Sequence, residues 1–101
     1  WYENISKVLA SQSDWATDDA PQCPGASPEL NNTTGFNGLP AGIRQTNGSF
    51  SGLNTRASWW SGSITGESAW YLGMFNYYPG EIWSVENRHY GFSVRCVKND
   101  D

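Results

Sequence analysis

The sequence predicts one small α+β domain with a short N-terminal helix, long loops and small antiparallel sheets. Its 101 residues suffice for a single modest core and leave no room for a second domain. Residues 1–10 carry apolar side chains at helical spacing, and an Asn-Gly pair at 47–48 lies between two short runs of strand type. Further short alternating runs follow residue 58, with turns between them. Strands at this spacing indicate an antiparallel sheet, and the helix before them makes the class α+β.

The first ten residues predict a short amphipathic helix. Its apolar side contains Trp1, Ile5, Val8 and Leu9. Glu3 and Lys7 fall on the opposite side, which we expect to face solvent. Residues 11–32 contain three prolines and many Asp, Ser and Asn residues, so they predict a long irregular segment in which Trp15 folds back as a lone anchor.

The Asn-Gly pair predicts a tight hairpin over residues 42–53. Both residues of the pair accept positive φ, and the runs GIRQT and SFSGL flank it. We expect Ile43 and Phe50 to face the core and Arg44 to face solvent.

Four more strands are predicted after the hairpin. The first begins at Trp59, and the others cover residues 69–75, 81–85 and 91–97. In the last strand the alternation places Phe92, Val94 and Cys96 toward the core.

Charge and hydropathy narrow the classes of partner. The net charge is −4, and Lys7 is the only basic residue in the first 29 positions, where several acids gather. This balance repels phosphate backbones, so we expect no nucleic-acid partner. No apolar run reaches the roughly 20 residues of a membrane span, so we expect no membrane insertion. Because the chain opens with Trp-Tyr-Glu and no Met, we interpret it as the C-terminal portion of a longer protein.

Two cysteines, Cys23 and Cys96, leave three possibilities open. One disulfide between them would suit an exported protein and would be worth roughly 2–4 kcal/mol. Alternatively, both are free thiols, or they pair with cysteines outside this sequence.

Catalytic and metal-binding patterns are sparse. His89 is the only histidine, and no G-x-S-x-G pattern accompanies it. Nothing singles out a catalytic pair among Glu67, Glu81 and Glu86. The cysteines and His89 lack the spacing of a metal site. We therefore expect a protein that is not an enzyme and has no metal or cofactor.

The aromatic residues give the strongest functional signal. Ten of the fifteen lie between positions 59 and 97, mixed with Asn, Ser, Gly, Glu, Arg and His. Large rings with small polar neighbours are typical of antibody combining loops. By their phase, Trp60, Trp70, Phe75 and Phe92 are expected in the core. Tyr77, Tyr78 and Tyr90 lie in turn-like stretches and are expected to be exposed. The pattern leaves Trp59 and Trp83 undecided.

An ordered series of short motifs resembles a known bacterial family. The motifs are GFNGLPAG (35–42), IRQTNGSFSGL (43–53), WWS (59–61), AWYLGMF (69–75) and GFSVRCVK (91–98). In this order they are similar to the C-terminal half of the Fibrobacter succinogenes major paralogous domain. That resemblance implies a C-type-lectin-like fold, shared with formylglycine-generating-type domains and with the variable proteins of diversity-generating retroelements. It does not imply calcium, since only WSVEN (83–87) comes faintly close to a calcium-binding motif of lectins.

In the variable proteins an exposed face is diversified, and the resemblance transfers this role to specific positions. The candidate ligand-facing residues are Asn54, Arg56, Ser58, Trp59, Tyr71, Asn76, Tyr77, Tyr78, Trp83, Glu86, Asn87, His89 and Tyr90. Aromatic anchors would supply affinity, and their polar neighbours would set specificity.

The expected function is noncatalytic recognition of a cell-surface glycan or protein, with a hypervariable binding face as one possibility. The protein would lie outside the cell, on a bacterial surface or a phage particle. One alternative is a structural or tip module of a surface lipoprotein, pilus or phage fibre, associated with other chains. A second is a relative of the formylglycine-generating enzymes, which use a cysteine pair for copper; Cys23 is poorly placed for that role.

Overall fold

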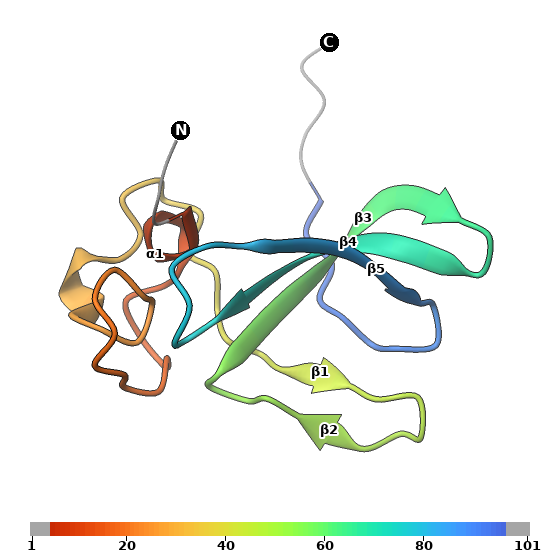
Figure 1. The fold of residues 1–101 in the computed structure, drawn as a ribbon, viewed down its shortest axis with the longest axis horizontal. Helices are drawn as coiled ribbons and strands as arrows, with labels where there is room; N and C mark the ends of the chain where they lie inside the picture. The colour runs from red at the N-terminus through yellow and green to blue at the C-terminus, as the bar shows by residue number, and fades with distance from the viewer. Residues whose placement is uncertain (1–4, 97–101) are drawn as a thin grey trace, which may run out of the picture.

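The computed structural model describes residues 5–96, which form one short helix, one 3-10 turn and two small antiparallel sheets (Figure 1). The elements are α1 (Ile5–Leu9), the 3-10 turn η1 (Pro28–Leu30), β1 (Ile43–Arg44), β2 (Phe50–Ser51), β3 (Arg56–Thr65), β4 (Ser68–Phe75) and β5 (Ile82–Asn87). The predicted α+β class, with a short helix, long loops and small antiparallel sheets, is therefore confirmed. In Figure 1, α1 and the long loops gather at one side of β3 and β4, and the turn between these two strands projects on the other side.

The larger sheet has the order β3-β4-β5 and is antiparallel throughout. Trp60 lies opposite Tyr71, and Tyr71 lies opposite Ser84. A β-bulge or similar irregularity shifts the register of β3 between Trp60 and Ile64. β3 begins three residues earlier than the sequence predicts, at Arg56, whose N–H donates to the Gly52 carbonyl at 2.8 Å in the turn after β2.

Residues opposite each other in a sheet project to the same side, so the register defines two faces. We call one the arginine face; its residues are Arg56, Ser58, Trp60, Tyr71, Gly73, Phe75, Ile82, Ser84 and Glu86. We call the other the tryptophan face; its residues are Ala57, Trp59, Trp70, Leu72, Met74, Trp83 and Val85.

The N-terminal segment packs on one end of the tryptophan face and makes the core there. The buried cluster consists of Ala10, Trp15, Ala57 and Met74, with Leu9 and Trp59 packed against it. The Trp15 indole Nε1 donates a hydrogen bond to the Gly38 carbonyl at 3.2 Å, which gives the buried ring its polar partner. The prediction that Trp15 folds back as an anchor is confirmed.

Lys7 contradicts the predicted amphipathic helix, because its side chain is only 6% exposed. Its Nζ donates to the carbonyl oxygens of Cys23 and Ser27 at 3.2 and 3.1 Å and to Asn31 Oδ1 at 2.8 Å, and it also donates to the Ala26 carbonyl. The loop that follows α1 wraps over the side of the helix that was expected to face solvent. The Cys23 and Ser27 carbonyls also accept backbone hydrogen bonds from Ala26 and Leu30, whereas the ammonium is the donor to the Ala26 carbonyl. Trp1 and Glu3 of that prediction lie outside the described residues.

The predicted hairpin forms, but its register differs by one residue. Ile43 lies opposite Ser51, and Arg44 lies opposite Phe50. Ile43 is buried as expected, whereas Phe50 is 79% exposed. The sequence predicts Phe50 on the same side of the hairpin as Ile43. A shift of one residue in the register moves each side chain to the other face, so Phe50 lies on the same side as Arg44.

The last predicted strand is reduced to two isolated bridges. Gly91 pairs with Arg44, and Ser93 pairs with Trp59. Beyond Ser93 no strand of residues 5–96 continues the pairing, so Val94 is 73% exposed and Cys96 is also exposed. The predicted inward orientation is wrong for both residues, and Phe92 alone remains half-buried. Val97 lies outside the described residues.

The possible disulfide is also wrong, because Cys23 and Cys96 are both free thiols. Cys23 is buried in the loop beneath α1, where its sulfur lies 3.7 Å from the Pro21 carbonyl oxygen. Burial raises the pKa of the Cys23 thiol, and the nearby charge of Asp18 adds to this effect. The neutral thiol is therefore the favoured form at Cys23.

Thiol labelling is expected to separate the two cysteines. In the native protein, a disulfide-exchange reagent added without reductant should modify Cys96 rapidly and Cys23 only when the protein unfolds, because a buried protonated thiol is a poor nucleophile. The measurement is the absorbance released by the reagent in buffer and in guanidinium. A Cys96→Ser variant should lose the rapid phase alone. Absence of any reaction in guanidinium would instead reveal a disulfide.

Candidate ligand-binding face

The arginine face carries a continuous cluster of aromatic rings centred on Phe92. The Phe92 centroid lies 4.3 Å from that of Trp60, 4.8 Å from that of Tyr71 and 5.9 Å from that of Tyr90. Trp60 and Tyr71 come from paired strands and meet edge to face at 6.5 Å. The chain after β5 thus folds back over the sheet and presses Phe92 onto it.

Arg56 extends this cluster along the face. Its guanidinium carbon lies 5.3 Å from the Phe75 ring centroid and 5.8 Å from the Phe92 centroid, so the charged group touches both rings. Its Nε donates to Ser58 Oγ at 3.1 Å. Phe75 in turn lies 5.4 Å from Tyr77, whose side chain is 56% exposed.

We call this set the arginine-aromatic cluster. It comprises Arg56, Trp60, Tyr71, Phe75, Tyr77, Tyr90 and Phe92. Only Tyr71 is buried among them; Tyr77 is exposed and the rest are half-buried. The cluster therefore offers ring faces, a hydroxyl-bearing rim and a cation to a ligand.

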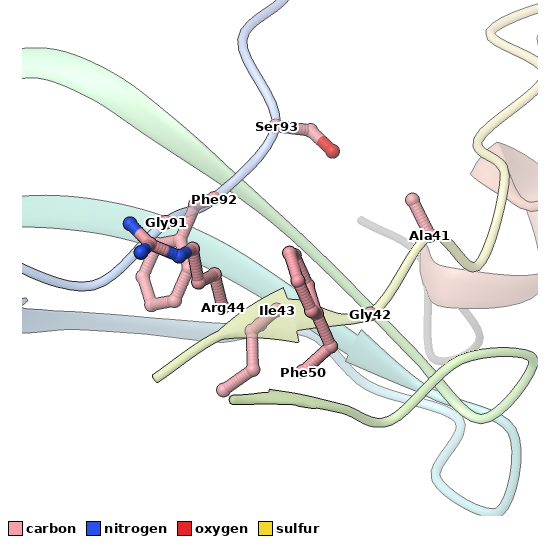
Figure 2. Close-up of a pocket in the computed structure, with 8 residues that line it drawn as sticks. All are labelled: Ala41, Gly42, Ile43, Arg44, Phe50, Gly91, Phe92 and Ser93. Carbon is pink, nitrogen blue, oxygen red and sulfur yellow. The ribbon is translucent and has the colours of Figure 1, made fainter. Parts of the chain in front are cut away.

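An open groove of about 230 Å³ lies beside the cluster, between the β1–β2 hairpin and the segment that carries Phe92 (Figure 2). It is lined by Ala41, Gly42, Ile43, Arg44, Phe50, Gly91, Phe92 and Ser93. Because Phe92 lines the groove and also contacts Arg56, the groove and the cluster adjoin. The exposed Phe50 is explained by this arrangement, since it forms one wall.

Gly91 holds the wall of the groove in place. Its N–H and carbonyl each form a 2.8 Å hydrogen bond with the backbone of Arg44. A Cβ at position 91 would lie 2.8 Å from the Arg44 Cβ, so the two segments approach this closely only with glycine. The pairing fixes where Phe92 enters the sheet.

A second hollow of about 310 Å³ lies at the bulge of β3. It is lined by Trp60, Ser61, Gly62, Ile64, Ala69 and Arg88. Arg88 is anchored there by a 3.2 Å hydrogen bond from Nε to the Glu67 carbonyl. This hollow shares Trp60 with the arginine-aromatic cluster.

The structure brings together several of the ligand-facing candidates but buries three. Arg56, Tyr77 and Tyr90 join the cluster, and Tyr77 is exposed as predicted. Ser58, Tyr71 and Asn76 are interior instead. Ser58 holds Arg56, Tyr71 supports Phe92, and Asn76 Nδ2 donates to the Ala16 carbonyl at 3.2 Å, so these three support the face from within.

The two undecided tryptophans lie on the tryptophan face, away from the cluster. Trp59 is half-buried and meets Phe36 edge to face at 5.4 Å. Trp83 is 55% exposed and stacks on Trp70 at 5.9 Å. Trp70, expected in the core, is only half-buried because the N-terminal segment covers the other end of this face.

The remaining candidates lie in turns and at strand ends. Tyr78 is exposed as predicted, and His89 is exposed in the turn after β5. Asn87 Oδ1 accepts a 2.8 Å hydrogen bond from the His89 N–H and thereby shapes that turn. Asn54 is exposed with φ of 70°, and Glu86 is half-buried opposite Ala69.

Sequence reasoning missed the groove. The sequence predicts no binding role for Phe50 or Gly91, and it predicts that Phe75 and Phe92 lie in the core. The number of residues in the β1–β2 turn sets the register of the hairpin, and this register places Phe50 beside Arg44. Turn length is therefore the feature of the sequence that indicates this wall of the groove.

Among residues 5–96, no group of three His, Cys, Asp or Glu side chains could hold a metal ion. No helix in that part of the chain is long and apolar enough to cross a membrane.

A comparison with protein-family models finds a match over most of the chain. The family model described as the Fibrobacter succinogenes major domain matches residues 7–98. No curated protein matches the chain. No solved structure matches it either.

Proposed function

The chain belongs to the Fibrobacter succinogenes major domain family, and from this membership together with the arginine face we propose that it is a noncatalytic recognition domain. The ligand is a glycan or protein on a cell surface. The observation that carries the proposal is the arginine-aromatic cluster, in which ring faces and a guanidinium stay accessible on one side of a rigid sheet. Four members of the cluster, Arg56, Trp60, Tyr71 and Phe75, lie on strands, which hold side chains more precisely than loops do.

Two features make the arginine face the better choice of binding surface. It joins exposed and half-buried rings with a charged group and hydroxyls, which is the composition of protein recognition sites. It also adjoins a groove, and concave surfaces bury a larger share of a ligand.

The proposal includes a C-type-lectin-like fold and an extracellular setting, on a bacterial surface or a phage particle. Both rest on the resemblance of the ordered motifs. Diversification of the binding face is a further part: Arg56, Tyr77 and Tyr90 are positions at which new side chains would change the ligand without disturbing the core. A near-identical repeat of the coding segment, differing at adenines and next to a reverse transcriptase gene, would establish it.

A structural module is the second candidate, and the tryptophan face favours it. Trp83 and Val85 are exposed there, and Trp70 and Leu72 are only half-buried. An apolar strip of this kind suits a contact with another chain. In this alternative the domain is one piece of a larger surface assembly.

The cysteines do not favour the enzymatic alternative. A copper site of the formylglycine-generating type needs a cysteine pair, whereas here one thiol is buried and the other is exposed.

The recognition proposal predicts that Tyr77→Ala combined with Tyr78→Ala weakens binding at least tenfold. Both side chains are exposed, and loss of a large tyrosine contact surface that acts as a hot spot costs more than about 1 kcal/mol. The purified chain is first screened on an array of immobilised glycans and cell-surface proteins. It is then titrated against the members of the array that it binds. Circular dichroism should be unchanged.

Trp83→Ala is the matched control, since it removes an equally exposed ring from the opposite face. It should leave array binding intact. If Trp83→Ala abolishes binding and the tyrosine pair does not, the tryptophan face is the functional surface and the recognition proposal for the arginine face fails.

A further inference from the structure

We propose that Arg56 is the receptor for a carboxylate on the ligand, and that the ligand class is an acidic glycan whose sugar units carry single carboxylates. This inference rests on the recognition function proposed above and specifies its ligand.

The Arg56 side chain has unused hydrogen-bonding capacity. A guanidinium has five N–H donors. Within residues 5–96 the Arg56 side chain makes one hydrogen bond, from Nε to Ser58 Oγ, and no carboxylate accepts a hydrogen bond from it. Both terminal nitrogens thus remain free to form the two parallel bonds that arginine makes with a carboxylate.

The Arg56 guanidinium is also held in a fixed position. Phe75 and Phe92 contact it at 5.3 and 5.8 Å, and Ser58 is itself buried. Gly52 packs against the aliphatic stem, since a Cβ there would lie 3.0 Å from the Arg56 Cβ. A side chain held on all these sides loses little conformational entropy when it binds, so a bidentate contact is strengthened.

The charged residues around the Arg56 guanidinium also favour an anionic ligand. Among the arginine-face positions of β3, β4 and β5, Glu86 is the only acid, and it lies opposite Ala69, whereas Arg56 lies opposite Phe75 at the other end of β4. The groove next to Phe92 contains a second arginine, Arg44, whose side chain is exposed. Two arginines, Arg56 and Arg44, thus adjoin Phe92 on a chain whose net charge is −4.

These charges favour a glycan over an acidic peptide. A dense run of carboxylates would be repelled by the net negative charge of the chain. Sugar units with one carboxylate each avoid this repulsion, because neutral hydroxyl-bearing rings separate the charges. The sugar rings would also stack on the exposed Tyr77 and hydrogen bond with the hydroxyl of Tyr90.

The test uses immobilised oligosaccharides that end in a hexuronic acid, each paired with its carboxyl-reduced hexose counterpart. The native chain should bind the acidic member at least tenfold more tightly, and added salt should weaken that member alone. Arg56→Gln should remove the discrimination between the two members. Arg56→Lys should remove most of it, because an ammonium retains the charge but cannot form the bidentate contact.

Arg88→Gln is the matched control, since it removes the same charge at the other end of the face, beside Glu67. It should leave the discrimination intact; an equal loss in this variant would indicate general attraction and would overturn the inference. Equal binding of both members, lost in the Tyr77→Ala/Tyr78→Ala variant, would overturn the role of Arg56 but support the recognition function. Binding to an acidic peptide series and to no oligosaccharide would overturn the ligand class. Circular dichroism of both Arg56 variants should match that of the native chain.

Discussion

Lys7→Met is expected to lower the free energy of unfolding by about 3 kcal/mol or more. Four oxygen acceptors surround the Lys7 ammonium: three loop carbonyls and Asn31 Oδ1. Methionine fills a similar volume but donates nothing. The Cys23 and Ser27 carbonyls keep backbone donors, but the Ala26 carbonyl and Asn31 Oδ1 lose theirs, at roughly 1–3 kcal/mol for each one that stays unsatisfied. For a domain of this size, such a loss is a large part of the total stability.

The same contacts explain why this position matters to the whole N-terminal layer. Asn31 is buried, and its amide also donates to the Ser11 and Pro24 carbonyls at 2.9 and 3.0 Å. Lys7 and Asn31 together therefore tie α1 to the loop that covers it. Burial lowers the pKa of Lys7, and the charge of Glu29 opposes that change. The hydrogen-bonded oxygens compensate the ammonium for part of the hydration it loses.

Urea denaturation followed by tryptophan fluorescence checks this prediction, because Trp15 is buried in the adjoining core. Gln12→Ala is the control: its exposed amide donates to the Glu29 and Asn31 carbonyls at 3.1 and 3.2 Å on the rim of the same loop. It should cost about 1 kcal/mol or less, since water replaces an exposed donor. A Lys7→Met variant as stable as the native chain would show that the loop carbonyls are satisfied without the ammonium.

Local patterns predicted the elements of this fold well, because each depends on residues close in sequence. The β1–β2 hairpin follows from Asn47 and Gly48, and β4 agrees with the predicted strand to within one residue. The family membership was likewise carried by short motifs in order. In each case the deciding interaction spans only a few residues.

Most of the errors involve contacts between distant segments. Lys7 looks like a surface residue of a helix until the loop that covers it is known. Val94 and Cys96 alternate like core residues, but no strand of the described chain lies beside them. The orientation of Phe50 depends only on the register of the hairpin. Its role as a wall of the groove, however, depends on Phe92, more than forty positions later.

The candidate site was predicted in composition but not in arrangement. Period-two alternation places Arg56 and Ser58 on one face, and it places Trp83 on the opposite face from Ser84. Alternation within the strands does not predict that the chain folds back over the sheet after β5. That return brings Phe92 against Trp60 and Arg56 and turns a row of side chains into a site.

Gly25→Ala is expected to cost about 3 kcal/mol, because the backbones of residues 16–18 and of Asn76 both approach this residue closely. An added Cβ would lie 2.4 Å from the Ala16 carbonyl oxygen, 2.9 Å from the Asn76 oxygen and 3.0 Å from the Asp18 nitrogen. None of these atoms belongs to a flexible side chain, so the backbone itself must move.

Such a movement would break the junction between the N-terminal layer and the sheet. The Gly25 N–H donates to the Asn76 carbonyl at 2.9 Å, and the Gly25 carbonyl accepts from the Asp18 N–H at 3.0 Å. Asn76 follows β4 directly, so the disturbance reaches the turn that carries Tyr77. Gly62→Ala is the matched control, since a Cβ there meets nothing within 4 Å and the residue has no positive φ. Urea midpoints of the two variants should differ widely, with Gly62→Ala close to the native chain. Equal midpoints would mean that the loop shifts away from Gly25 at little cost, and that the N-terminal layer is not held to β4 through this contact.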